Sequence, residues 1–298
     1  MAESQNVSHH DATREKVGVT AHFVAGLRAR EHNKSEGRLF SDPYAQCLVG
    51  NIFDKSARFM YPSSSTASHK DAAKYMEEDG RLKAVPQGLS DGVAVRTRKI
   101  DDEMMTYLSG VSQSQICVLG AGLDTRPWRV ELPDASGQSN ISYFEVDFPE
   151  IFEYKLPALS AAGAVSRFSY KAVNADLGVP GWTDKLLAAG FNPFLPTFWL
   201  LEGFTGYLTE EEFHSVFNVM TQISASGSRL VATFVTPTTK ITTTMHRFTP
   251  DVPINEVTKH KGWRGKQHDI RDIGKEMGRE WADASMDGYY IVLADYIK

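Results

Sequence analysis

Short apolar runs alternate with amphipathic stretches over the second two-thirds of the chain. The runs occupy residues 114–122, 141–148, 196–203 and 228–235. Between them, residues 148–162 and 209–222 carry apolar positions at helical spacing. Thr209, followed three residues later by Glu212, forms a capping box that marks a helix start. This alternation predicts an α/β fold with a mostly parallel sheet and helices on both faces.

The first hundred residues predict helices instead. Residues 17–30 have helical spacing, and Asp42 followed by Pro43 fits a second helix start. Residues 61–74 are rich in serine and other small residues, which favours a mobile loop, with a linker between domains as the alternative. The last residues, "GYYIVLADYIK", predict one or two late strands that suit an antiparallel pair at a sheet edge. We therefore expect a disordered tail over 1–15, a helical N-terminal cap over 16–110 and a core over 111–298.

Composition limits the classes of partner. With 42% hydrophobic and 23% charged residues among 298, the chain has the composition of a soluble globular protein. The net charge of -5 gives no general attraction to nucleic acid or anionic membranes. The first residues lack the apolar core of a signal peptide, and no window approaches the ~20 apolar residues of a membrane span. Two cysteines, Cys47 and Cys117, are too few for a disulfide framework. We expect a cytoplasmic protein that binds neither nucleic acid nor membrane.

Glycines and an acid follow two of the predicted strands. Ligands bind beyond the carboxyl ends of strands in sheets of this kind. Gly120 and Gly122 would let backbone amides approach a ligand closely. Asp147 ends the next run, where an acidic side chain can accept both ribose hydroxyl protons. The NAD pattern requires a third glycine where this chain has Thr125. The pattern predicts a cofactor with a free ribose, and an NAD-dependent oxidoreductase stays open as an alternative.

Longer motifs carry a family resemblance over roughly residues 20–220. The motifs are "GLRAREHNKSEGRLFSDPYAQCLVG", "VRTRKIDDEM", "ICVLGAGLDTRPWR", "YFEVDFPEIFEYK", "NADL" and "LPTFWLLEGFTGYLTEEE". In this order they resemble the leucine carboxyl methyltransferase family, whose members are S-adenosylmethionine-dependent and include small-molecule O-methyltransferases. The resemblance implies a class I, Rossmann-like methyltransferase core. It also implies S-adenosyl-L-methionine as cofactor and S-adenosyl-L-homocysteine as product.

The resemblance assigns a set of residues to the cofactor. They are Arg28, Arg96, Gly120, Ala121, Gly122, Asp147, Phe148, Asp176, Leu177 and Glu202. Arg96, helped by Arg28, would pair with the methionine carboxylate, and Asp147 would hold the ribose. Asp176 would bind the adenine amine, and Glu202 would face the sulfonium end. Arg126 belongs to the same motif, but a structural role is favoured for it, in which it pairs with an acid.

The resemblance also places Glu202 and Tyr207 near the acceptor, as the candidate catalytic residues. A carboxylate acceptor, with a pKa near ~4, is already ionised at neutral pH and needs no general base, whereas a phenol or enol needs one. The motifs after the predicted strands contain no histidine, since His32 lies in the N-terminal motif and His214, His246, His260 and His268 lie outside all of the motifs. This favours a small-molecule carboxylic acid as substrate. Phenol or enol methylation would be favoured by a histidine in the acceptor pocket, and methylation of a protein C-terminal leucine is a further alternative.

The chain departs from the family at one position that bears on the acceptor. Many relatives have an arginine after the Asp-Leu pair, where this chain has Gly178. Replacement candidates for binding the substrate are Arg247 and Arg264, in a polar segment over 236–268 that we expect to form an acceptor lid. The sequence shows no cluster of His, Cys and Asp at ligand spacing, so it predicts no metal.

Overall fold

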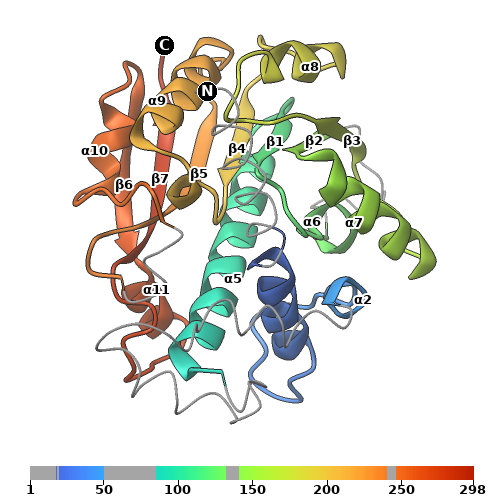
Figure 1. The fold of residues 1–298 in the computed structure, drawn as a ribbon, viewed down its shortest axis with the longest axis vertical. Coiled ribbons are helices and arrows are strands. Elements are labelled where there is room, and N and C mark those ends of the chain that lie inside the picture. Colours follow the sequence, from blue (N-terminus) through green and yellow to red (C-terminus); the bar gives the residue numbers. More distant parts are fainter. Residues whose placement is uncertain (1–17, 19, 50–84, 132–140, 240–245) are drawn as a thin grey trace, which may run out of the picture.

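One sheet forms the centre of the computed structural model, which describes residues 18, 20–49, 85–131, 141–239 and 246–298. The described strands are β1 (Gln115–Leu119), β2 (Ser142–Asp147), β3 (Ser169–Asn174), β4 (Thr197–Leu201), β5 (Arg229–Val235), β6 (Trp263–Asp269) and β7 (Tyr289–Tyr296). Their order is β3-β2-β1-β4-β5-β7-β6 (Figure 1). β1 to β5 are parallel, and β7 runs antiparallel to both β5 and β6. The mostly parallel sheet that the sequence predicts is confirmed.

Helices connect the strands. Besides the helical residues 20–32, the structure has α2 (Ala45–Val49), α5 (Gln87–Gly110), α6 (Arg126–Arg129), α7 (Pro149–Ala161), α8 (Trp182–Ala188), η1 (Thr205–Tyr207), α9 (Glu210–Gln222), α10 (Pro253–Thr258) and α11 (Ile270–Glu276). The predicted capping box starts α9, because the Glu212 N–H donates to Thr209 Oγ1 at 3.1 Å. Asp42 acts as predicted at α2, where its Oδ1 accepts from the N–H of Ala45.

Helices cover both faces of the sheet, so two apolar clusters flank it. Successive side chains of a strand point to opposite faces. On β1, Ile116 and Val118 pack in a cluster with α5, α11 and the 20–32 helix, while Cys117 and Leu119 pack in another with α8 and α9. Figure 1 shows α5 and the 20–32 helix next to each other on the first of these faces. The burial of β1 on both faces explains why its sequence is an unbroken apolar run.

The C-terminal part forms an antiparallel strand pair at a sheet edge, as the sequence predicts, but the second strand of the pair comes from residues for which we expect no strand. β7 is an inner strand, and β6 forms the sheet edge beside it. The segment 236–268, which we expected as a lid, contains α10 and most of β6. β6 was missed because its exposed, polar side chains, such as Arg264 and Lys266, have no apolar pattern. Such polar edge strands are common, since they discourage pairing with other chains.

Two expectations concern residues outside the described part of the chain. These are the disordered tail over 1–15 and the loop over 61–74. The helical N-terminal cap is seen only in part, as the 20–32 helix, α2 and α5. None of the helices in the described residues is long and apolar enough to cross a membrane.

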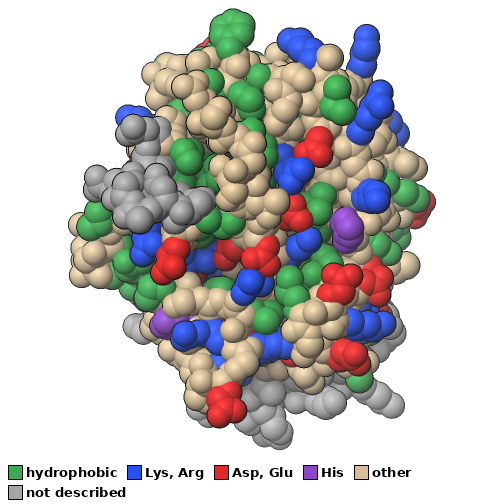
Figure 2. Space-filling model, turned by 180° about the vertical axis from the view of Figure 1, so that it is seen from behind, with side chains coloured by type: hydrophobic (Ala, Val, Ile, Leu, Met, Phe, Trp, Pro, Cys, Tyr) green, Lys and Arg blue, Asp and Glu red, His purple; other side chains and the backbone are tan. Residues whose placement is uncertain are grey.

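Charges of both signs are interspersed on the face seen from behind (Figure 2). Many described charges form ion pairs, such as the 2.8 Å pairs Arg98–Asp102 and Arg229–Asp295. Exposed pairs of this kind contribute at most about 1 kcal/mol each. The stability of the fold therefore rests on the two apolar clusters, and the charges that matter for chemistry are the buried ones.

Candidate active site

The turn after β1 requires glycine at its first position. Gly120 has a φ of +71°, and a Cβ there would lie 2.5 Å from Cδ2 of Phe204. Gly122 also has a positive φ, of +50°. Its N–H donates to Asp147 Oδ2 at 2.7 Å, and the N–H of Phe148 donates to Oδ1 at 2.7 Å. The backbone thus holds the Asp147 carboxylate at the carboxyl ends of two neighbouring strands, β1 and β2.

The Asp147 carboxylate has the features of a ribose-binding group. It is buried, which raises its pKa, although the two backbone N–H groups partly offset this effect. Each carboxylate oxygen has two acceptor positions, and one backbone bond occupies one of them. Both oxygens can therefore accept a further hydrogen bond from a diol. The turn and the acid fit an adenosyl cofactor.

A buried network of ion pairs lies behind the turn. Glu202, just after β4, contacts Arg96 through Oε1 at 2.7 Å and Arg126 through Oε2 at 2.6 Å. Arg126 also pairs with Asp124 at 2.8 Å and with Asp101 at 2.7 Å. Burial alone would raise the pKa of Glu202, but Arg126 and Arg96 outweigh it and lower that pKa. Glu202 is therefore ionised, and these contacts confirm the predicted pairing of Arg126 with acids.

Arg28 connects the turn to the N-terminal helices. Its guanidinium pairs with Asp42 at 2.9 Å and donates to the backbone oxygen of Leu123 at 2.6 Å. Asp42 accepts a further bond from the Thr125 hydroxyl at 2.7 Å. Burial would raise the pKa of Asp42, but Arg28 and Arg129 lower it overall. Arg28 thus fixes the position of the turn.

The other end of the site, which we expect to meet the acceptor, is formed by η1 and by the chain after residue 245. The Tyr207 hydroxyl donates to Thr20 Oγ1 at 3.1 Å, and burial raises the pKa of Tyr207, so its phenol stays protonated at neutral pH. The N–H of Arg247 donates to the backbone oxygen of Gly206 at 2.7 Å. This bond brings the His246 ring against Gly206, where a Cβ would lie 2.8 Å from its Cδ2.

His246 is a residue that the sequence did not single out for the site. It lies far from the motifs in sequence, and a backbone bond to η1 rather than a local pattern places it. Burial lowers its pKa, so the ring is neutral at neutral pH. Its buried Nδ1 has no hydrogen-bond partner among the described residues. The ring can therefore accept a proton.

One cavity brings nearly all the predicted site residues together. Those that line it are Arg28, Arg96, Gly120, Ala121, Gly122, Asp147, Phe148, Asp176, Leu177, Glu202, Tyr207 and Arg247. Arg264 is not among its lining in the described part of the chain, because its exposed side chain lies on β6, paired in register with Asp295. We therefore drop Arg264 as a substrate-binding candidate. Residues that the sequence did not predict also line the cavity, and they include Phe204, Thr233, His246, Met286 and Tyr289.

Comparison with known proteins decides the family. The leucine carboxyl methyltransferase family model matches residues 21–221. The chain belongs to this family. A protein of Parafrankia sp. (strain EAN1pec), described as an S-adenosyl-L-methionine-dependent methyltransferase, is 32% identical over 301 residues, which cover 95% of this chain and 88% of that protein. A relative from Mycobacterium marinum (strain ATCC BAA-535 / M) with the same description is 34% identical over 218 residues, which cover 72% of this chain and 63% of that protein.

Solved structures share the fold of this family member. A protein from Thermobifida fusca YX, described as a methyltransferase, superposes with a TM-score of 0.55 and 14% identity, covering 88% of this chain and 95% of its own. A DUF574 family protein from Streptomyces avermitilis MA-4680 superposes with a TM-score of 0.53 and 12% identity. The match covers 91% of this chain and 96% of that protein. The chain is an S-adenosyl-L-methionine-dependent methyltransferase with a class I, Rossmann-like fold, which decides against the NAD-dependent alternative.

Proposed function

We propose that this methyltransferase forms methyl esters on carboxylates of small-molecule acids. The family name points to carboxyl acceptors. The observation that carries the proposal for this chain is Arg247, which lines the cavity and whose guanidinium lies 3.4 Å from the backbone oxygen of Tyr207. The side chain is 43% exposed, and Glu212 holds it at 3.1 Å. A carboxylate acceptor needs such a cation to replace the water that it leaves.

The donor end has a complementary group for each part of S-adenosyl-L-methionine. Asp147 would accept the ribose hydroxyls, and Asp176 with Leu177 would frame the adenine. Arg96 would bind the methionine carboxylate, because a guanidinium has five N–H donors and its described contacts use two nitrogens, Nε and one terminal nitrogen. The ionised Glu202 would face the positively charged end. When bound, the cofactor supplies an electrophilic methyl group on a sulfonium.

The chain's own residues would then contribute by binding and alignment. A carboxylate is already nucleophilic at neutral pH, so no residue has to remove a proton from it. Arg247 would orient its charge, and the protonated Tyr207 hydroxyl could donate a hydrogen bond to it. Phe204 and Met286 line the cavity with apolar surface that excludes water. Alignment and water exclusion are the main requirements of a methyl transfer of this kind.

His246 supports a second candidate function, O-methylation of a phenol or enol. The sequence favours a carboxylate partly because the motifs after the strands contain no histidine, but the fold brings His246 to the cavity. Its neutral ring and unpartnered Nδ1 are the properties of a general base. A hydroxyl acceptor bound next to this nitrogen could lose its proton as the methyl group is transferred.

One assay separates these candidates. Tritiated S-adenosyl-L-methionine is incubated with the protein and with matched acceptor pairs, each an aromatic acid and the phenol that has the same ring, and with a peptide ending in leucine. We expect label on the acids that mild base releases, as it does from an ester. Base-stable label on the phenols would overturn the carboxylate proposal in favour of the second candidate. Label on the peptide alone would indicate the protein C-terminus as substrate. Asp147→Ala serves as the control that loses donor binding.

A further inference from the structure

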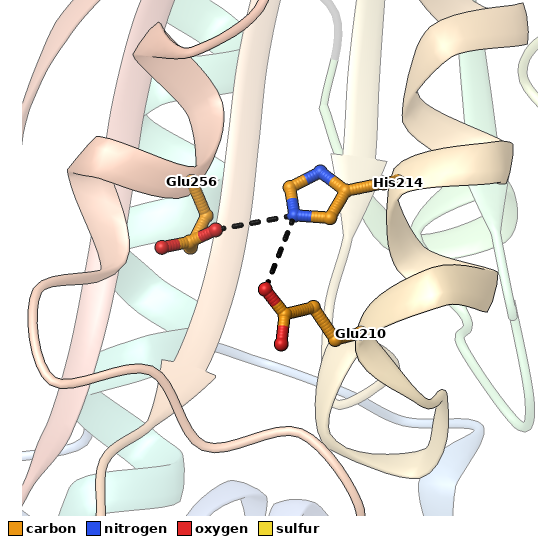
Figure 3. A group of neighbouring side chains, drawn as sticks. All are labelled: Glu210, His214 and Glu256. Atoms are coloured by element: carbon orange, nitrogen blue, oxygen red, sulfur yellow. Dashed lines mark ion pairs between the residues drawn. The ribbon is translucent and has the colours of Figure 1, made fainter.

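A cluster of possible metal ligands lies outside the donor and acceptor cavity, between α9 and α10. His214 Nε2 is 3.2 Å from Oε2 of Glu256 and 3.9 Å from Oε1 of Glu210. One ligand atom from each of these three residues lies within 4.8 Å of the other two. Figure 3 shows Glu210 and His214 projecting from α9 towards Glu256 on α10. Sequence inspection misses the cluster because Glu256 and His214 are far apart in the chain.

The helices explain how the three side chains meet. Glu210 and His214 are four positions apart on α9, so they share one helix face. Glu256 lies on α10, and His260 follows four positions later, just beyond the end of that helix. The His260 ring lies against His214, with 5.3 Å between ring centroids. α9, and α10 with the residues just after it, thus each bring a glutamate and a histidine four positions apart to the space between the two helices.

The hydrogen bonds of His260 determine the tautomer of the neutral His214 ring. His260 Nδ1 is 2.9 Å from the amide oxygen of Asn218, which only accepts, so this nitrogen carries the proton. His260 Nε2 then has a lone pair, and it accepts from His214 Nδ1 at 3.1 Å. In the neutral ring this leaves a lone pair on His214 Nε2, directed at two carboxylates. Such an arrangement is repulsive unless a cation, either a proton on Nε2 or a metal ion, lies between them.

We propose that Glu210, His214 and Glu256 bind a zinc ion. Tetrahedral zinc with bonds of about 2.0–2.2 Å requires ligand atoms roughly 3.3–3.5 Å apart. The ligand atoms of His214 and Glu256, at 3.2 Å, are within about 0.1 Å of this separation. Glu210 is 67% exposed, so its side chain is free to close the remaining distance. His260 and Asn218 supply the outer hydrogen bonds that orient a ligating histidine, and water completes the coordination.

A surface hollow through which an ion can enter, and a lysine that competes with a metal, both lie next to the site. Glu210 and Glu256 line a second hollow on the surface, which gives an ion a path to them. The Nζ of Lys259 contacts both oxygens of Glu256, at 2.8 and 2.7 Å. Its side chain is 54% exposed and can turn into solvent when a metal takes its place. Zinc affinity therefore depends on Lys259, whose removal favours the metal.

The bound ion would join α9 to α10. The chain between β5 and α10 carries His246 and Arg247, and Glu212 on α9 pairs with Arg247. A metal bridge would therefore stabilise the wall of the acceptor end without touching the reacting atoms. The inference does not depend on the acceptor class, since the site lies outside the cavity that holds the substrates.

The test uses the full chain, without an affinity tag and stripped of metal with chelator. Cobalt(II) is titrated as a spectroscopic probe, and zinc(II) binding is measured by calorimetry and by the shift of the melting temperature. We expect saturable binding of one ion per chain, visible absorption typical of tetrahedral cobalt, and a higher melting temperature with zinc. His214→Gln and Glu256→Gln should weaken binding at least tenfold, and Lys259→Met should strengthen it.

Glu211→Gln is the matched control, because it makes the same charge change on the exposed side of α9. It should bind metal as the unmodified chain does. The His214 variant keeps His9 and His10, so binding at those histidines would persist in it. Absence of saturable binding in the unmodified chain would overturn the proposal. Unchanged affinity in a folded His214→Gln protein, checked by circular dichroism, would do so as well.

Discussion

The Arg96 guanidinium donates a 2.8 Å hydrogen bond to the hydroxyl of Tyr289, a residue 193 positions later in the chain. The bond joins α5 to β7, and the same guanidinium faces Glu202 after β4. The donor end of the cavity is therefore built from three elements that are distant in sequence. The orientation of Arg96 depends on all of them.

Tyr289→Phe tests this dependence. The change removes one hydrogen bond to a buried, charged guanidinium, worth about 1.5–3 kcal/mol, so binding of S-adenosyl-L-homocysteine should weaken roughly 10- to 100-fold. Isothermal titration calorimetry measures the affinity. Tyr290→Phe is the control, because Tyr290 does not line the described cavity. Equal affinities for the two variants would show that Tyr289 does not position Arg96.

Gly120→Ala should weaken donor binding in addition to lowering stability through backbone strain. A left-handed φ costs a residue with a Cβ about 1–2 kcal/mol. Gly163 has the same φ of +71°, but a Cβ there meets nothing within 4 Å, whereas at Gly120 it meets Phe204 at 2.5 Å. Urea unfolding should therefore show a loss of stability in Gly163→Ala with unchanged nucleoside affinity. Gly120→Ala should lose at least tenfold in affinity as well, and equal binding by both variants would contradict this reading of the turn.

The sequence predicts the central strands and many of the residues that line the cavity at their ends, for a physical reason. β1, β2 and β4 are buried on both faces, so they appear as apolar runs, and the site residues follow their ends directly. The sequence pattern does not predict β3 and β6, because they are the two edges of the sheet and carry exposed polar side chains. Their sequences resemble loops.

The acceptor end could not be predicted in the same way. His246 and Tyr289 reach the cavity through bonds to residues far away in the chain: the N–H of Arg247, next to His246, donates to Gly206, and Arg96 donates to the Tyr289 hydroxyl. No local pattern marks such contacts. Glu202 is an intermediate case, since an acid after an apolar strand indicates a buried charge, but its two arginine partners emerge only from the fold.

Lys155 and Glu145 form a fully buried ion pair, at 2.7 Å, that can be replaced as a unit. Lys155→Met alone leaves a buried carboxylate without its cation and should cost about 3–5 kcal/mol in the free energy of unfolding. The double variant Lys155→Met with Glu145→Gln should be close to the unmodified chain, because glutamine still offers an acceptor to the Tyr170 hydroxyl. Urea unfolding checks both. A double variant as unstable as the single one would contradict the argument.

The same pair predicts a pH dependence of stability. Burial raises the pKa of Glu145 to about 7, although Lys155 opposes the shift. A carboxyl whose pKa is higher in the folded protein binds more protons there than in the unfolded chain, whose glutamate pKa is about 4.3. Its contribution to stability is therefore fully present below pH ~4 and is lost as the pH rises through 7. Unfolding series between pH 5 and 8 should show this decline, relative to the double variant.

His246→Gln separates the two acceptor chemistries kinetically. With a carboxylate acceptor the rate should change little, because no proton has to be removed. With a phenol, loss of a general base should lower kcat about 10²- to 10⁴-fold. Burial lowers the pKa of His246, so in the phenol case the unmodified chain should lose rate only below pH ~6.5. A pH–rate profile for both acceptors measures this.

Arg247→Met should weaken binding of the acceptor and leave binding of the donor unaffected. A hydrogen bond to a charged group is worth about 1.5–3 kcal/mol, so KM for an acid substrate should rise roughly 10- to 100-fold. The affinity for S-adenosyl-L-homocysteine should not change. Arg264→Met is the matched control, since it removes the same charge from an exposed edge strand. Equal KM values for the two variants would remove Arg247 from the acceptor site.

The family match ends at residue 221, before β5, yet the cavity takes His246, Arg247 and Met286 from the chain beyond that point. The chain beyond residue 221 thus completes both ends of the cavity, through Tyr289 beside Arg96 and through Arg247 beside Tyr207. Recombination near residue 222 would therefore change the partner of Arg96 together with His246 and Arg247. Chimaeras joined there would reveal whether the two stretches must come from the same protein.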